Sequence, residues 1–228
     1  MNRKVIFGLA ALVLVVMACS LSPVTTSKTP TANQPANGGV SGSQTLFKDD
    51  FSDVGSGWDR TTNESYSTDY ASGGYRIYVI PESYSAFANP YKTFQNDVRV
   101  EVDATKTAGP DDNAFGVQCR YQDVDNYYFF YISSDGYVGI GIDKAGEKSI
   151  ISSSDGNMAG DSNVKQGATT NHIRADCVGS TLTLYVNGSQ AATASDSSFT
   201  GGDVGLIARS FATGGTDILF KNFQVNKP

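Results

Sequence analysis

The sequence contains few basic residues and a single histidine. Its 228 residues include 17 Lys and Arg against 23 Asp and Glu, which gives a formal net charge of −6 at pH 7. Because Lys and Arg that neutralise phosphates supply most of the affinity for nucleic acid, we expect no nucleic-acid partner. One histidine, His172, cannot form a multi-histidine metal site, and no Gly-x-Ser-x-Gly elbow accompanies it. We expect His172 to be a surface residue.

The sequence also lacks an apolar run long enough for an ordinary transmembrane helix. The longest run, Val5 to Ala18, is shorter than the roughly 20 residues that a span requires, and it follows Arg3 and Lys4. This layout predicts a secretory signal peptide over residues 1–18. The end of the run, Val16-Met17-Ala18-Cys19, resembles a bacterial lipobox. The resemblance implies a lipidated Cys19 and an extracytoplasmic lipoprotein that is anchored to a membrane without spanning it.

Residues 19–44 contain almost no large apolar side chains after Cys19. Ser, Thr, Pro, Asn and Gly dominate this stretch. Such a composition cannot bury enough surface to offset the entropy of ordering the chain. We therefore expect a disordered linker between the lipid anchor and the rest of the protein.

Residues 45–228 have the period-two pattern of β-strands and no sustained helical stripe. In Val98–Ala104 one parity is apolar and the other charged, as in a strand with one face on the core. Asn187-Gly188 after such a run predicts a tight hairpin. Further strands are expected at Tyr75–Ile80, Phe115–Tyr121, Tyr128–Ile132, Ile173–Cys177, Leu182–Val186, Val204–Ala208 and Ile218–Val225. The pattern predicts one all-β domain, a two-sheet antiparallel β-sandwich or jelly roll.

Five segments of this domain carry a family resemblance: Leu46–Phe51 with Gly57-Trp58, Ala114–Ile140, Asn171–Gly188, Gly202–Arg209 and Thr216–Val225. Together they resemble the concanavalin A-like lectin and glucanase jelly roll. Within that superfamily, the domain is most similar to the laminin-G-like and 3-keto-disaccharide-hydrolase-like domains. The resemblance implies two stacked antiparallel sheets, with sugars contacted on the concave face and its rim loops.

Cys119 and Cys177 are an even pair in a domain that we expect to be exported. Each shares a strand parity with apolar neighbours, so both should point inward. They could be two buried free thiols or a core disulfide. We favour the disulfide because the expected compartment is oxidising.

Glu101 and Asp103 are the candidates for glycoside hydrolysis, because two carboxylates on one strand face could flank a glycosidic bond. Glucanases of the resembled fold carry a Glu-x-Asp-x-x-Glu strand, and here Lys106 occupies the third position. The alternative is a polar outer strand face without chemistry.

A calcium site is a second implication of the resemblance. It would combine oxygen atoms from Asp49 or Asp50, in the first strand, with Asp217 in the last. Carboxylates are also common at strand ends without any ion. The sequence therefore leaves open whether calcium is a cofactor.

Strand parity predicts a patch that could bind sugar. Gln118 and Arg120 should point away from the core on one strand, and Phe129 and Tyr131 should do so on the next. Planar aromatic faces beside a few polar groups are what a sugar site needs. Rim loops could instead cover the patch. Trp58 could lie at its rim, or equally pack beneath the first strand.

The favoured function is a membrane-anchored lipoprotein whose sandwich domain binds carbohydrate or another extracellular ligand. One alternative is an enzyme of the 3-keto-disaccharide or glycoside hydrolase type, with Glu101, Asp103 or Arg120 at its site. Another is an adhesion module that recognises protein.

Overall fold

The computed structural model describes residues 43–228. The predicted signal peptide at 1–18, Cys19 and nearly all of the linker lie outside the described residues. Sixteen strands and no helix occur in the described residues. Accordingly, that part of the chain offers no helix with the length and apolar character to cross a membrane.

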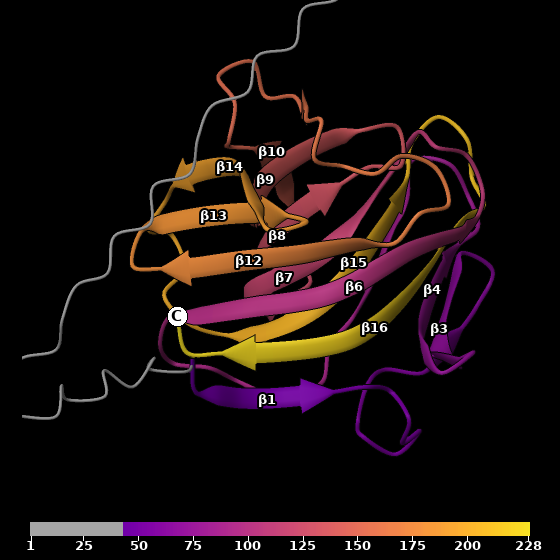
Figure 1. Cartoon of the computed structure of the whole chain (residues 1–228), viewed down its shortest axis with the longest axis horizontal. Coiled ribbons are helices and arrows are strands. Elements are labelled where there is room, and N and C mark those ends of the chain that lie inside the picture. The colour runs from indigo at the N-terminus through magenta and orange to yellow at the C-terminus, as the bar shows by residue number, and fades with distance from the viewer. Residues whose placement is uncertain (1–42) are drawn as a thin grey trace, which may run out of the picture. The chain divides into compact units, whose positions relative to one another are not determined.

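The strands form two antiparallel sheets, A and B, that enclose one large core (Figure 1). Sheet A has nine strands, in the order β14 (Ser189–Ser195), β13 (Thr181–Val186), β12 (Asn171–Val178), β6 (Val98–Ala108), β16 (Thr216–Asn226), β4 (Gly74–Val79), β3 (Tyr66–Ala71) and β2 (Thr61–Thr62), with β1 (Thr45–Asp49) paired to β16. Sheet B has seven strands, in the order β10 (Glu147–Ile150), β9 (Tyr137–Lys144), β8 (Asn126–Ile132), β7 (Asn113–Asp123), β15 (Asp203–Ser210) and β5 (Ser85–Ala88), with β11 (Ala159–Gly160) paired to β9. The predicted two-sheet antiparallel sandwich is confirmed.

The alternating pattern of β6 places its apolar residues in the core and its charged residues outside. Val100 and Val102 have no exposed surface. On the outer face, Glu101 lies opposite Arg174 of β12, and Arg99 lies opposite and pairs with Asp176. Opposite charges facing each other across strands stabilise this register.

The predicted hairpin joins β13 to β14. Asn187 and Gly188 have φ angles of 51° and 88°. Positive φ at both central residues is what a type I′ turn requires, and its twist matches that of the flanking strands.

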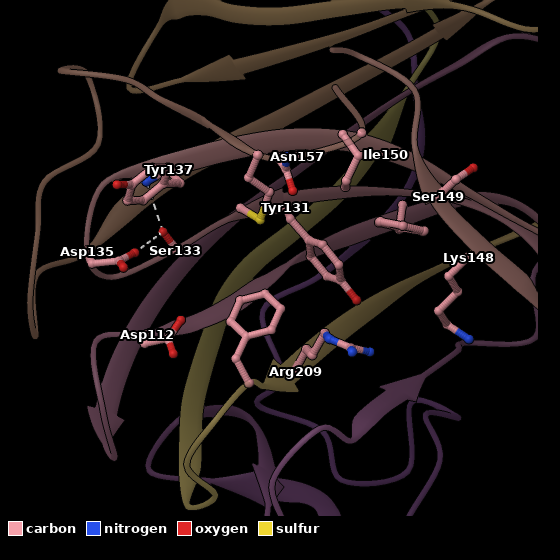
Figure 2. Close-up of a pocket in the computed structure, with 14 residues that line it drawn as sticks. Asp112, Tyr131, Ser133, Asp135, Tyr137, Lys148, Ser149, Ile150, Asn157 and Arg209 are labelled. Carbon is pink, nitrogen blue, oxygen red and sulfur yellow. Dashed lines mark hydrogen bonds between the residues drawn. The ribbon is translucent and has the colours of Figure 1, made fainter. Parts of the chain in front are cut away.

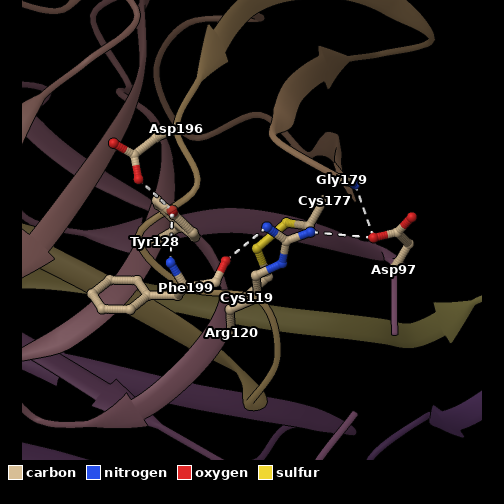
Figure 3. Close-up of a disulfide and its surroundings, with 8 residues drawn as sticks. All are labelled: Asp97, Cys119, Arg120, Tyr128, Cys177, Gly179, Asp196 and Phe199. Carbon is tan, nitrogen blue, oxygen red and sulfur yellow. Dashed lines mark hydrogen bonds and ion pairs between the residues drawn. A yellow bond between two sulfur atoms is a disulfide. The ribbon is translucent and has the colours of Figure 1, made fainter. Parts of the chain in front are cut away.

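A disulfide between Cys119 of β7 and Cys177 of β12 joins sheet B to sheet A (Figure 3). Neither cysteine has exposed surface. The bond therefore lies in the core between the two sheets, as the inward parity of both residues predicts.

Trp58 also lies in the core and not at a rim, so it is not available to a ligand. It is 4% exposed, and its ring packs 4.9 Å from that of Phe223 and 5.3 Å from that of Phe51, measured between centroids. Its indole Nε1 donates a hydrogen bond to Asp49 Oδ2 at 2.9 Å. The large aromatic ring fills the space beneath β1, and its one polar atom has a buried acceptor.

Burial of Asp203, at the start of β15, makes a testable contribution to the pH dependence of stability. Burial raises the pKa of this carboxyl to about 6, although Oδ1 accepts hydrogen bonds from the amides of Lys92 and Val204. Because the folded state holds this proton to a higher pH than the unfolded chain, the group's contribution to the unfolding free energy falls as pH rises from about 4 to about 6.

We therefore expect Asp203→Asn to gain stability relative to the wild type, on the order of 1 kcal/mol, between pH 4 and pH 7. Urea denaturation at the two pH values measures this difference. Asp112→Asn, at an exposed carboxyl, is the control. A constant difference between Asp203→Asn and the wild type would show that Asp203 titrates normally.

Candidate functional site

A cavity of about 580 Å³ lies on the outer face of sheet B, away from the core (Figure 2). Aromatic, aliphatic, charged and amide side chains all line it. The lining residues are Asp112, Phe129, Tyr131, Ser133, Asp135, Tyr137, Lys148, Ser149, Ile150, Gly156, Asn157, Met158, Arg209 and Phe211.

Alternate residues of β8 form one wall of the cavity. Tyr128 and Phe130 belong to the main core, whereas Phe129 and Tyr131 belong to a separate apolar cluster on the outer face. The centroids of the Phe129 and Tyr131 rings are 4.7 Å apart. Gly141 of β9 makes room for one of these rings, because a Cβ atom at this position would lie 2.1 Å from Phe129 Cζ. The aromatic ring can therefore lie directly over the neighbouring strand.

The turn between β8 and β9 supplies polar groups at one end of the cavity. Ser133 Oγ donates a hydrogen bond to Asp135 and accepts one from the Tyr137 amide at 2.9 Å. Gly136 has a φ of 102°, which closes the turn. These bonds fix Asp135 and Tyr137 at the cavity, where the Tyr137 side chain is exposed.

The segment that follows β10 folds back over β9 and forms another wall. The two residues of β11 pair with Tyr137 and Val138 of β9. This pairing brings Met158 against Gly139, where a Cβ atom would lie 2.9 Å from Met158 Cγ. The cavity is therefore bounded by a loop as well as by the sheet.

The end of β15 adds a cation. Arg209 lies on the outer face, and its Nη1 donates a hydrogen bond to Ser85 Oγ at 3.0 Å. The guanidinium carbon lies 5.4 Å from the centroid of the Phe211 ring. Stacking on Phe211 and the bond to Ser85 hold the arginine in place.

Buried polar atoms without hydrogen-bond partners are concentrated on this face of sheet B. Residues 43–228 contain seven such side-chain atoms, and six of them belong to Gln118, Tyr127, Tyr131 and Asp143. Asp143 is accompanied by the ammonium group of Lys148, although its oxygens accept no well-aligned hydrogen bond. The Tyr131 hydroxyl is the orphaned atom whose residue lines the cavity. Such a group gains a full hydrogen bond when a ligand supplies the partner.

The structure brings together only part of the predicted sugar patch. Phe129 and Tyr131 line the cavity, and Gln118 lies opposite Phe129 in the register of β7 and β8. Gln118 has no exposed surface and does not line the cavity, so it is covered.

Arg120 does not belong to the patch. Its φ of 51° marks an irregularity in β7 that interrupts the alternation of faces. The guanidinium instead lies beside the disulfide, where it donates to the Phe199 carbonyl at 2.9 Å and pairs with Asp97 (Figure 3). Arg120 therefore stabilises the region around the disulfide and does not line the cavity.

Glu101 and Asp103 lie on the outer face of sheet A, on the other side of the sandwich. Asp103 contacts His172 Nδ1 at 2.8 Å and accepts a hydrogen bond from Asn222. Glu101 accepts hydrogen bonds from Gln224 and from a second amide of β16. Neither carboxylate lines the cavity on sheet B, and His172 is partly exposed beside them.

The structure does not bring the calcium candidates together. Asp49 lies opposite Phe223 near one end of β16 and accepts hydrogen bonds from Trp58 and a backbone amide, whereas Asp217 lies near the other end and pairs with Arg76. Asp50 is exposed. Over residues 43–228, no three His, Cys, Asp or Glu side chains are grouped to hold a metal ion. These three residues do not fit a shared calcium site.

Sequence reasoning missed most of the remaining cavity residues. Strand parity could have found Arg209, which alternates with the inward Leu206 and Ala208. Asp135, Asn157 and the other loop residues carried no comparable signal, because their positions depend on how the turns fold over the sheet.

The arrangement suits a small polar ligand that also has apolar faces. The exposed Tyr137 ring and the half-buried Phe211 ring offer apolar surfaces, and the Tyr131 hydroxyl, Arg209 and Asp135 offer donors and acceptors around them. A few placed polar groups on a largely apolar concave wall are typical of small-ligand sites.

Comparisons with known proteins show the fold. No protein-family model matches the chain, and a search of curated proteins finds no match. Among solved structures, the carbohydrate binding module CBM66 from Bacillus subtilis is 18% identical, with a TM-score of 0.59 over 75% of this chain and 96% of that chain. A Bacillus subtilis protein with a galectin-like fold is 9% identical, with a TM-score of 0.59 over 81% of this chain and 96% of that chain.

A third structure is a GlcNAcα1-4Gal-releasing endo-β-galactosidase from Clostridium perfringens, which is 9% identical, with a TM-score of 0.58 over 82% of this chain and 64% of that chain. Identities this low establish architecture and not activity. The described residues of this chain form a concanavalin A-like jelly-roll sandwich.

Proposed function

We propose that the protein is an extracytoplasmic lipoprotein, anchored to a membrane through Cys19, whose sandwich domain binds carbohydrate in the cavity on sheet B. The observation that carries the binding proposal is the orphaned Tyr131 hydroxyl beside the Phe129 ring in that cavity. A sugar ring offers an apolar face for the aromatic ring and hydroxyls for the phenol.

Two further observations support this proposal. A carbohydrate binding module and a carbohydrate-acting enzyme share the fold. The apolar run before Cys19 and the polar segment after it support the anchor. Mass spectrometry of the protein from cells, which should show acyl chains on Cys19 and no residues before it, tests that part.

The binding proposal is tested by screening the purified protein against a glycan panel and titrating the best ligand. We expect Tyr131→Phe, which keeps the ring and removes the hydroxyl, to weaken binding about 2- to 10-fold. Phe129→Ala should weaken it about 10-fold or more, because it removes the apolar wall. Circular dichroism and thermal unfolding confirm that each variant is folded.

Glu101→Gln is the matched control, because it alters a carboxylate on the outer face of sheet A. It should leave glycan affinity unchanged. Binding to no glycan, or unchanged affinity in a folded Phe129→Ala variant, would overturn the proposal. Release of reducing sugar that is lost in Glu101→Gln would instead support the hydrolase.

A further inference from the structure

The two signs of charge occupy different sides of the sheet B cavity. In Figure 2, Asp112 and Asp135 lie at the left, whereas Lys148 lies at the right and the Arg209 guanidinium points toward it. The Tyr131 hydroxyl points to the same side as the two cations. The cavity therefore has an acidic end and a basic end.

Arg209 is unusual among the arginines of the structure. Residues 43–228 contain six arginines, and five of them form an ion pair with an aspartate. Arg209 forms none among these residues and donates a single side-chain hydrogen bond, from Nη1 to Ser85. Lys148, by contrast, is paired with the buried Asp143. The net positive charge at the basic end therefore comes from Arg209.

The Nε and Nη2 groups of the Arg209 guanidinium are suited to binding a carboxylate. With Nη1 bonded to Ser85, Nε and Nη2 carry N–H groups with no acceptor among the described residues. Two parallel N–H donors in this planar fork match the two oxygens of a carboxylate. An isolated ammonium group would give charge without this geometry.

Tyr131 adds a neutral donor at the same end. Burial raises the pKa of its hydroxyl above the usual range, so the phenol keeps its proton at physiological pH. A protonated phenol can donate to an anion without adding charge. At the other end, Asp112 and Asp135 can accept hydrogen bonds from sugar hydroxyls and repel an anion, which fixes the direction of the ligand.

We infer that the cavity selects glycans with a carboxylate-bearing sugar, and that Arg209 binds this carboxylate while the aromatic rings contact the sugar face. The inference rests on the proposed carbohydrate binding and names its ligand class. The whole protein carries a net charge of −6, so nonspecific electrostatic attraction does not favour an acidic glycan. The selectivity must come from the local cation.

The test is calorimetric titration of the purified protein with three matched ligand sets: uronic acid oligosaccharides, the same oligosaccharides with carboxyls reduced to alcohols, and sulfated neutral oligosaccharides. We expect the acidic form to bind about 10- to 100-fold more tightly than its reduced counterpart. Arg209→Gln should abolish this preference, so that the acidic and reduced forms bind with equal affinity. Arg209→Lys should retain only part of the preference for the acidic form, because lysine keeps the positive charge and loses the two parallel N–H donors.

Lys221→Gln is the control for net charge, because it removes an exposed cation from β16 on sheet A. It should leave the preference intact. Equal affinity for acidic and reduced glycans would overturn the inference and leave the proposed function standing. Stronger binding of sulfated than of uronic glycans would overturn the assignment of a carboxylate. Absence of binding to any glycan would overturn both.

Discussion

Replacing Cys119 and Cys177 together by alanine is expected to lower the free energy of unfolding by about 4 kcal/mol. The bond joins residues 58 positions apart and connects β7 of sheet B to β12 of sheet A. Without it, the unfolded chain regains the conformational freedom that a closed loop of this length removes. A loss of this size is a large fraction of the stability of an ordinary domain.

Urea denaturation of the wild type and the double variant measures the effect. Treatment of the wild type with reductant under native conditions should change little, because both sulfur atoms are fully buried, and reduction after unfolding should reproduce the variant. A double variant with the stability of the wild type would show that the bond does not constrain the unfolded chain.

Trp58→Ala is expected to cost about 3 to 5 kcal/mol of unfolding free energy. The substitution removes a ring packed against Phe51 and Phe223, and it takes the indole donor away from the buried carboxylate of Asp49. The empty space left by the Trp58 ring lowers the free energy of unfolding. The loss of a hydrogen bond to the buried Asp49 carboxylate lowers it further. Thermal or urea unfolding provides the measurement.

Measurements of glycan affinity distinguish the role of Trp58 in the core from that of the residues that line the cavity. At a temperature where both variants remain folded, the affinity of Trp58→Ala for a glycan should equal that of the wild type, whereas Phe129→Ala should lose affinity. If Trp58→Ala bound glycan more weakly while fully folded, the ring would contribute to the site and not only to the core.

The fold could be predicted from the sequence because the strands carry strong local signals. The alternation in β6 fixes which residues face the core, and Asn187-Gly188 fixes a hairpin through its left-handed backbone. Parity over Tyr128–Ile132 predicts the two faces of β8, although both faces are buried. Such patterns depend on neighbouring residues, so one sequence suffices to recognise them.

Strand parity predicts the face on which a side chain lies. Phe129 and Tyr131 lie on the outer face of sheet B, as parity predicts. Arg120 was misplaced because β7 contains an irregularity at this residue, which parity cannot detect. Trp58 lies in a loop between strands, where the sequence does not determine whether a large aromatic ring turns inward.

Asp49 and Asp217 show that strand position alone does not predict which side chains meet. They occupy strands of the same sheet, as the resemblance implied, but Asp49 of β1 lies opposite Phe223 of β16, six residues along β16 from Asp217. Each carboxylate has its own partner, Trp58 for Asp49 and Arg76 for Asp217. Register between strands decides which side chains meet, and it depends on tertiary packing that a single sequence does not display.

The central claim is that a glycan binds the outer face of sheet B. The most direct measurement is a titration of the isotope-labelled protein with its best glycan, followed by backbone amide chemical shifts. The account predicts that the largest changes occur in β8 around Phe129 and Tyr131, at Tyr137 of β9 and at Arg209. Changes confined to the outer face of sheet A around Glu101 and His172 would contradict it.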